Sequence, residues 1–124
     1  MGRLRPATLL AANAEAIPLP DASQDIVTSV FLFHELPPDV RRIVAGEMAR
    51  VLKHGGTLVF IDSLQMGDRP GWDGLLEAFP HRFHEPYYRQ YTIEDLDGMF
   101  RDVGLAAVGW WPAFLSKVMV RRKT

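Results

Sequence analysis

Residues 25–62 carry the pattern that most limits the fold. Two apolar segments, 25–33 and 57–62, are rich in β-branched and aromatic residues and are apolar at both even and odd positions. Such segments are typical of strands that are buried on both faces of a parallel sheet. An amphipathic segment with short joints connects them, so the sequence predicts a βαβ unit with a right-handed crossover.

The connecting segment has the signals of a helix. Pro37, Pro38 and Asp39 suit a first turn, and Gly55-Gly56 suits a helix end. Residues at helical spacing predict one apolar face, formed by Val40, Ile43, Val44, Met48, Val51 and Leu52. The charged residues fall mostly outside this stripe and are predicted to be solvated: Asp39, Arg41, Arg42, Glu47, Arg50 and Lys53.

The segments on either side are less regular. Residues 7–12 could form a strand, although alanine is a poor strand former. A short helix is predicted over 72–79, where Pro80 stops it. Residues 81–91 are aromatic and polar without a clear period, which predicts a loop or lid.

The end of the chain predicts a helix and two strands. Thr92 with Asp95 resembles a capping box, and residues 93–103 have helical spacing before Gly104. Two strands are expected, over 105–111 and 115–122, the second in an outer, antiparallel position. Trp110-Trp111 is interpreted as packing for this hairpin or as part of an interface, and Arg121-Arg122-Lys123 as a solvated terminus.

Composition excludes several classes of protein. The chain has 124 residues, so we expect one domain over residues 1–124. It has no cysteine, which excludes disulfides and thiolate metal sites. A net charge of −1 argues against a dedicated nucleic-acid binder. No apolar run is long enough for a membrane span and no leader is evident, so we expect a cytoplasmic protein with no membrane partner.

Three segments, in this order, resemble class I S-adenosylmethionine-dependent methyltransferases. Residues 13–25 (NAEAIPLPDASQD) are similar to the family's DAExLPFPDxSFD stretch. Residues 31–36 (FLFHEL) match the segment that leaves the family's fourth strand, and residues 47–58 (EMARVLKHGGTL) match its ExxRVLKPGGxL signature. The closest branch is the "methyltransferase type 11" branch, which includes the ubiquinone and menaquinone biosynthesis enzymes.

The resemblance implies a fold and also a gap in it. It implies an α/β fold: a partial Rossmann-like sheet of parallel strands with a C-terminal antiparallel hairpin and helices on its faces. The family's sheet order is 3-2-1-4-5-7-6, and its glycine-rich first motif has no counterpart here, because the chain contains no Gly-x-Gly. The chain thus resembles the carboxy-terminal half of the domain. Strand 25–33 then becomes an exposed edge, which we expect residues 7–12 or a second copy in a homodimer to cover.

The resemblance also implies a cofactor site. It places Asn13 and Ala14 at the adenine of S-adenosylmethionine, and Val30 and Phe31 near its methionine part. The alternative for Val30 and Phe31 is plain core. Asn13 replaces an acidic residue of the family, and an amide can still hydrogen-bond a base edge.

Residues that follow the first strand are candidates for the acceptor side. His34 is a candidate general base, and the alternative is a hydrogen-bonding residue at the helix entry. Glu35, Tyr87 and Tyr88 are candidates for substrate binding. The aromatic residues of 81–91, which include Phe83 and Tyr91, are candidates for a substrate lid. The alternative is that they simply cover the end of the sheet.

His81, His84 and Glu85 suggest a metal site at first sight. Histidines three residues apart share a face only in a helix, and Pro80 and Pro86 disfavour a helix here. We therefore expect no metal.

By family resemblance, the function is methyl transfer from S-adenosylmethionine to a small molecule. The alternative is a non-catalytic half-domain, or a truncated fragment, that cannot bind the cofactor alone and dimerises through its exposed strand edge. The missing glycine-rich turn is the feature that separates the two.

Overall fold

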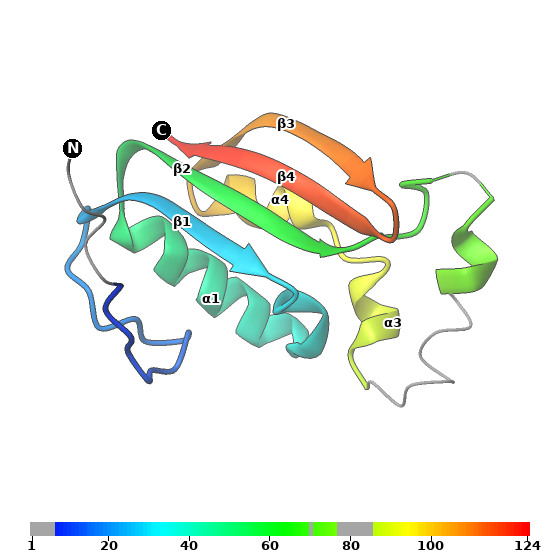
Figure 1. The fold of residues 1–124 in the computed structure, drawn as a ribbon, viewed down its shortest axis with the longest axis horizontal. Helices are drawn as coiled ribbons and strands as arrows, with labels where there is room; N and C mark the ends of the chain where they lie inside the picture. The colour runs from blue at the N-terminus through cyan, green and yellow to red at the C-terminus, as the bar shows by residue number, and fades with distance from the viewer. Residues whose placement is uncertain (1–6, 70, 77–85) are drawn as a thin grey trace.

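A helix between two parallel strands organises the structure, a computed structural model that describes residues 7–69, 71–76 and 86–124 (Figure 1). β1 spans Gln24–Val30, α1 spans Pro38–Val51 and β2 spans Leu52–Ser63. β1 pairs with β2 in parallel, with Val30 beside Ile61. The predicted βαβ unit is therefore confirmed.

A C-terminal hairpin completes the sheet. β3 (Leu105–Ala113) and β4 (Ser116–Lys123) pair antiparallel, and β4 also pairs antiparallel with β2. The strand order is β1-β2-β4-β3, which has the order 4-5-7-6 that the resemblance implies. β4 is antiparallel as expected, but the prediction of an outer position is wrong: β4 lies between β2 and β3, and β3 is the outer strand.

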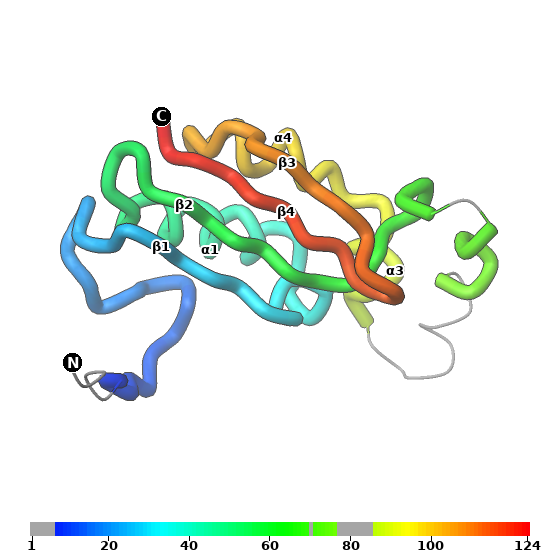
Figure 2. Tube along the Cα trace, turned by 45° about the horizontal axis from the view of Figure 1, so that its top comes forward, coloured from blue at the N-terminus to red at the C-terminus, as the bar shows by residue number. Residues whose placement is uncertain are grey.

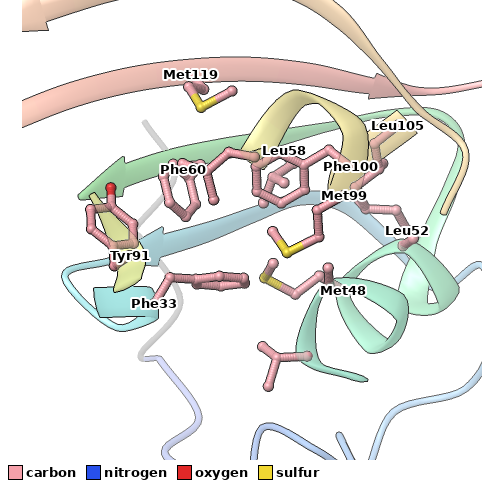
Figure 3. Close-up of a cluster of buried hydrophobic side chains, with 14 residues drawn as sticks. Phe33, Met48, Leu52, Leu58, Phe60, Tyr91, Met99, Phe100, Leu105 and Met119 are labelled. Atoms are coloured by element: carbon pink, nitrogen blue, oxygen red, sulfur yellow. The ribbon is translucent and has the colours of Figure 1, made fainter. Parts of the chain in front are cut away.

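The hydrophobic core lies on one face of the sheet, under α1 and α4 (Leu96–Asp102). Figure 3 shows Met48 of α1 and Met99 of α4 beneath the strands, with the rings of Phe33, Phe60 and Phe100 packed beside them. The ring of Phe60 lies edge-on to those of Phe33 and Phe100, with centroids 5.1 and 5.2 Å apart. Each such buried side chain contributes about 1.5–3 kcal/mol by leaving water.

The opposite face of the sheet is covered by no helix within the described ranges, as Figure 2 shows with the strands in front of α1 and α4. Ile26 and Val30 point away from the core and are 63% and 57% exposed. The prediction that this strand is buried on both faces is therefore wrong for the described residues. Trp110 and Trp111 are also half exposed, and the Lys117 ammonium lies 5.1 Å from the Trp110 ring.

The helix ends earlier than its glycines suggest. α1 stops at Val51, and Leu52 is already paired with Gln24 in the sheet. Gly55 has a φ of +80°, and a Cβ on Gly56 would lie 2.8 Å from the Lys53 carbonyl oxygen. The glycine pair therefore shapes a bend at the start of β2 and does not cap the helix.

Residues 7–12 form no strand. Leu9 is 92% exposed, and the segment runs outside the sheet without pairing to β1. The predicted strand here is wrong, and the edge of β1 is not covered by this segment. An apolar run becomes a strand only where a partner strand accepts its backbone hydrogen bonds.

The segment before the hairpin is more ordered than a loop. Tyr88–Tyr91 form a short helix, α3, and Tyr91 is fully buried in the core. Of the predicted helix 72–79, residues 73–76 are helical and 77–79 lie outside the described residues.

The predicted cap at Thr92 is wrong. Asp95 is the N-cap of α4 and accepts from Gly98 N–H at 2.9 Å, while the Thr92 hydroxyl donates to the Arg89 carbonyl. A carboxylate at the N-cap satisfies a free amide of the first turn, so the helix begins at Leu96 and not at Ile93.

Two arginines predicted to be solvated are buried. Arg41 is fully buried beneath η1, the single turn Phe33–Glu35, and Arg121 is almost fully buried between Leu105 and Asp97. Ile43 shows the reverse error, since it is half exposed. Helical spacing places α1 against the sheet but does not show which polar side chains other loops will cover.

Candidate functional site

The candidate site lies where β1 and β2 end. Phe31 follows β1 with a φ of +52° and donates its N–H to the Ile61 carbonyl at 2.8 Å. This left-handed residue turns the chain out of the sheet, so that η1 passes over the end of β2. The carboxyl ends of parallel strands are where open α/β sheets place ligands.

Asp62, near the end of β2, binds the turn that crosses it. Its side chain is fully buried and accepts from the backbone N–H groups of Phe33 at 2.9 Å and Ser63 at 2.7 Å. Its Oδ1 also lies 2.7 Å from His34 Nδ1. The carboxylate therefore fixes both the backbone and the imidazole of η1.

His34 sits between this buried carboxylate and the surface. Its side chain is 12% exposed, and its Nε2 lies 3.8 Å from Oε1 of the exposed Glu35. The rings of Tyr88 and Tyr91 lie edge-on to it, with centroids 5.6 and 6.3 Å away. The structure thus brings together three of the predicted acceptor-side residues: His34, Glu35 and Tyr88. The described hydrogen bond of the His34 side chain goes to Asp62 and not to α1.

The predicted tyrosines differ in position. Tyr88 is buried and its hydroxyl is hydrogen-bonded to the Ser63 hydroxyl. Burial raises the pKa of the neighbouring Tyr91 phenol well above its ordinary value, and the Asp62 carboxylate adds to the shift. Tyr87 is partly exposed, and its carbonyl accepts from Arg41. Tyr88 and Tyr91 therefore cover the sheet end beside His34, whereas Tyr87 lies at the surface.

An apolar groove runs along β1 beside α1. Its volume is about 360 Å³, and it is lined by Ala14, Ile17, Val27, Thr28, Ser29, Val30, Leu32, Val44 and Met48. Two of the four predicted cofactor residues, Ala14 and Val30, share this groove. Asn13 and Phe31 are not among its lining residues, and the Asn13 side-chain oxygen accepts from Glu15 N–H within its own turn.

Two charged residues of α1 hold the loop that forms one wall of the groove. Glu47 accepts from Ile17 N–H at 2.9 Å, and Arg50 donates to the carbonyls of Ile17 and Leu19. The hydrogen bond from Arg50 lowers the pKa of the Glu47 carboxyl, and Glu47 and Asp21 raise the pKa of Arg50 above its ordinary value. These residues were predicted to be solvated only; in fact they fasten Ile17 over the groove.

A buried arginine, Arg41, also stabilises the site. The Arg41 guanidinium donates to the carbonyls of Phe33 and Tyr87, each at 2.9 Å, and to Gln90. Burial lowers its pKa, while Glu94 and Tyr91 partly offset that effect. Arg41 therefore links η1 to the segment that carries the tyrosines.

Sequence reasoning missed Asp62, Arg41 and the Glu47–Arg50 pair. Asp62 did have a signal, because a carboxylate at the end of a buried parallel strand lies where ligand sites form. Arg41 had none, since its carbonyl partners are distant in sequence.

Two further expectations from the sequence concern a metal site and a membrane span. His81, His84 and Glu85 lie outside the described residues. Across 7–69, 71–76 and 86–124, no group of three potential metal-binding side chains occurs. The same residues contain no helix long and apolar enough to cross a bilayer.

Comparisons with known proteins agree with this geometry. The methyltransferase domain family model matches residues 2–60. Demethylmenaquinone methyltransferase of Listeria welshimeri is 32% identical over 118 residues, covering 81% of this chain and 49% of that protein. The ubiquinone/menaquinone biosynthesis C-methyltransferase of Methylobacterium nodulans is 38% identical over 73 residues, 59% of this chain and 28% of that protein.

A solved structure agrees in fold. A possible histamine N-methyltransferase from Thermotoga maritima superimposes with a TM-score of 0.71 at 17% identity, over 93% of this chain and 63% of that one. The chain spans about half or less of the length of the curated relatives named above.

The chain is thus similar in sequence to the methyltransferase domain family over residues 2–60, and its fold is that of solved Rossmann-like methyltransferases. Its sequence is also similar to the demethylmenaquinone and ubiquinone/menaquinone methyltransferases, which confirms the resemblance seen in its three sequence motifs.

Proposed function

We propose that this chain carries the acceptor-facing part of an S-adenosylmethionine-dependent methyltransferase that acts on a small molecule. The main support for this proposal is that Ala14 and Val30 line the same groove. That groove follows the same strand whose end leads to His34. Methyl transfer depends mainly on holding two reactants in line. In this arrangement the groove proposed for the cofactor and the candidate base His34 lie on adjoining parts of the chain.

The groove fits part of the cofactor. A volume of about 360 Å³ is at the lower end of ligand pockets, which are roughly 300–1,000 Å³. Its lining is apolar apart from Thr28 and Ser29, and the Ser29 hydroxyl is buried without a hydrogen-bond partner among the described residues. An aromatic base suits such a wall. No charged side chain lines it to hold the ribose hydroxyls or the amino-acid end, so those parts need other residues.

The cofactor supplies an electrophilic methyl group when bound, and this chain supplies the groups around it. Ala14, with Asn13 adjoining it, would hold the base, and Val30 and Phe31 would lie near the methionine part. His34 would take a proton from the acceptor. Glu35, which is exposed beside His34, and Tyr87, which is partly exposed, would contact the acceptor, while the buried Tyr88 supports the imidazole.

Titration calorimetry with S-adenosylhomocysteine tests this proposal. We expect micromolar binding, and a loss of about tenfold or more in affinity for Ala14→Arg, which places a long charged side chain at an apolar groove. Ala16→Arg is the matched control, because Ala16 is exposed in the same loop and does not line the groove. The absence of binding by the wild-type chain, or equal losses in both variants, would contradict the proposal.

A second function is favoured by the edge of β1. Its outer side has no partner strand among the described elements, and Ile26, Val30 and Phe31 are exposed on or next to it. Exposed apolar edges pair readily with other strands. The chain would then be a non-catalytic half-domain that dimerises through β1.

Sedimentation velocity separates this alternative from the first. If β1 forms the interface, Ile26→Lys should convert a dimer to a monomer, whereas Val108→Lys on the other edge strand should leave it dimeric. A wild-type monomer whose β1 amides exchange freely with solvent would rule out the dimer.

A further inference from the structure

We infer that Asp62 is a positioning residue that fixes the tautomer of His34, with the proton on Nδ1 and the basic lone pair on Nε2. The inference rests on the proposed function in one respect: His34 is taken as the group that accepts a proton from the methyl acceptor. The tautomer itself is a property of the folded chain and can be measured without any reaction.

The Asp62 carboxylate is held in place independently of His34. Its two oxygens accept from the backbone N–H groups of Phe33 and Ser63, on two different elements. The side chain is fully buried, so water does not compete for these bonds. Hydrogen bonds to an ionised carboxylate are among the stronger ones in proteins. The imidazole therefore meets a carboxylate whose orientation is already set.

This geometry selects one tautomer of the imidazole. An ionised carboxylate only accepts hydrogen bonds, so a contact of 2.7 Å between His34 Nδ1 and Asp62 Oδ1 requires the proton to be on Nδ1. In the neutral ring, Nε2 is then the atom that can accept a proton.

The surroundings also suit a ring that becomes charged. Nε2 faces the exposed Glu35, 3.8 Å from its Oε1, while Nδ1 faces the buried Asp62. The imidazolium would thus lie between two carboxylates.

The step balances without any further reactant. The acceptor loses one proton to Nε2 and forms a bond to the methyl carbon. The bond between that carbon and sulfur breaks, and its electron pair stays on sulfur. The proton on Nε2 afterwards returns to water on the Glu35 side.

Long-range ¹H–¹⁵N NMR of the histidine rings tests the inference on the intact chain without cofactor. The signals of His34 are identified by their loss in His34→Gln, since the chain has four histidines. We expect the neutral wild-type ring to be protonated at Nδ1. A neutral ring protonated at Nε2 would overturn the inference, whatever the variants show.

Asp62→Ala gives a second test of the same pair. It removes the acceptor that Nδ1–H requires, so the ring should no longer be held in the Nδ1-protonated form and the Nε2-protonated form should appear. Asp25→Ala is the matched control, because Asp25 is an exposed carboxylate paired with Lys53. An unchanged Nδ1-protonated ring in Asp62→Ala would overturn the inference. If that variant does not fold, the wild-type tautomer still decides.

Activity separates this inference from the proposed function. If the chain transfers methyl groups, Asp62→Ala should lower kcat about 100-fold or more with little change in KM, because a base in the wrong tautomer cannot take the proton. An inactive wild type with the predicted tautomer would count against the proposed function alone. An active Asp62→Ala with unchanged kcat would count against the role of Asp62.

Discussion

Arg41 donates its Nε hydrogen to the carbonyl oxygen of Phe33, 2.9 Å away and eight residues earlier in the chain. Its remaining nitrogens bind Tyr87 and Gln90, so one buried cation holds together η1, α1 and the start of α3. A buried charge is stable only when its hydrogen-bonding groups are paired. The candidate site therefore depends on a residue that contacts neither groove nor acceptor.

Replacing Arg41 should destabilise the whole chain. Arg41→Met leaves two carbonyls without their donor, and we expect the free energy of unfolding to fall by about 2–4 kcal/mol. Urea denaturation measures this. The neighbouring Arg42 has an exposed side chain paired with Glu94, so Arg42→Met should change stability by only about 0.5 kcal/mol. Equal effects of the two variants would contradict the structural role given to Arg41.

Removing Arg50 should loosen the groove wall without unfolding the protein. In Arg50→Met the carbonyls of Ile17 and Leu19 lose their donor. We expect faster hydrogen exchange at the Ile17 amide and weaker binding of S-adenosylhomocysteine, with little change in overall stability. Lys53→Met, which removes a more exposed charge near the same end of α1, serves as the control. An unchanged Ile17 exchange rate would show that the loop is held in another way.

Phe31 should tolerate glycine better than alanine. Its φ of +52° lies in the left-handed region, which costs residues with a Cβ about 1 kcal/mol relative to glycine. Both variants lose the same aromatic ring, so Phe31→Gly should be more stable than Phe31→Ala by about 1 kcal/mol. Thermal denaturation of the pair measures the difference. A more stable alanine variant would mean that the turn out of β1 relaxes away from this conformation.

Stability should fall in alkaline solution because of Tyr91. Burial raises the pKa of this phenol in the folded state above its ordinary value of 10.0, so the unfolded chain loses the proton first. The resulting stability is fully present below pH 10 and is lost as the pH rises through the folded pKa.

Urea denaturation on either side of pH 10 measures this loss. In Tyr91→Phe the alkaline loss should be smaller, after allowance for the neutral-pH cost of the hydrogen bond to the Ser63 carbonyl. Tyr87→Phe, at the partly exposed neighbour, should keep the wild-type pH dependence. A Tyr91→Phe variant with the wild-type alkaline loss would assign that loss to other groups.

The sequence predicts well what depends on local pattern. The βαβ unit, the sheet order implied by the family resemblance and the antiparallel hairpin follow from runs such as 57–62, where apolar periodicity and turn residues agree. The predicted face of α1 is correct at Val44 and Met48 but not at Ile43, which is half exposed.

The errors occur where distant segments meet. Gly55-Gly56 suggests a helix cap, yet Leu52 already pairs with Gln24, so β2 begins before the two glycines. Arg41 and Arg121 look solvated until η1 and the hairpin close over them. For the site, His34 and Glu35 follow from the motif, but their relation to Asp62 depends on the crossing of η1 over β2, which spacing does not predict.

The central position of β4 has a consequence for synthesis on the ribosome. β4 follows every other described element in sequence, yet it supplies the partner for one side of both β2 and β3. While residues 116–123 are still in the exit tunnel, β2 has one open side and β3 has no partner strand. The four-stranded sheet therefore cannot close during translation of β3, and the sides of β2 and β3 that β4 will pair stay exposed on the nascent chain until β4 emerges. Chaperones that bind extended apolar segments would meet the chain in that interval.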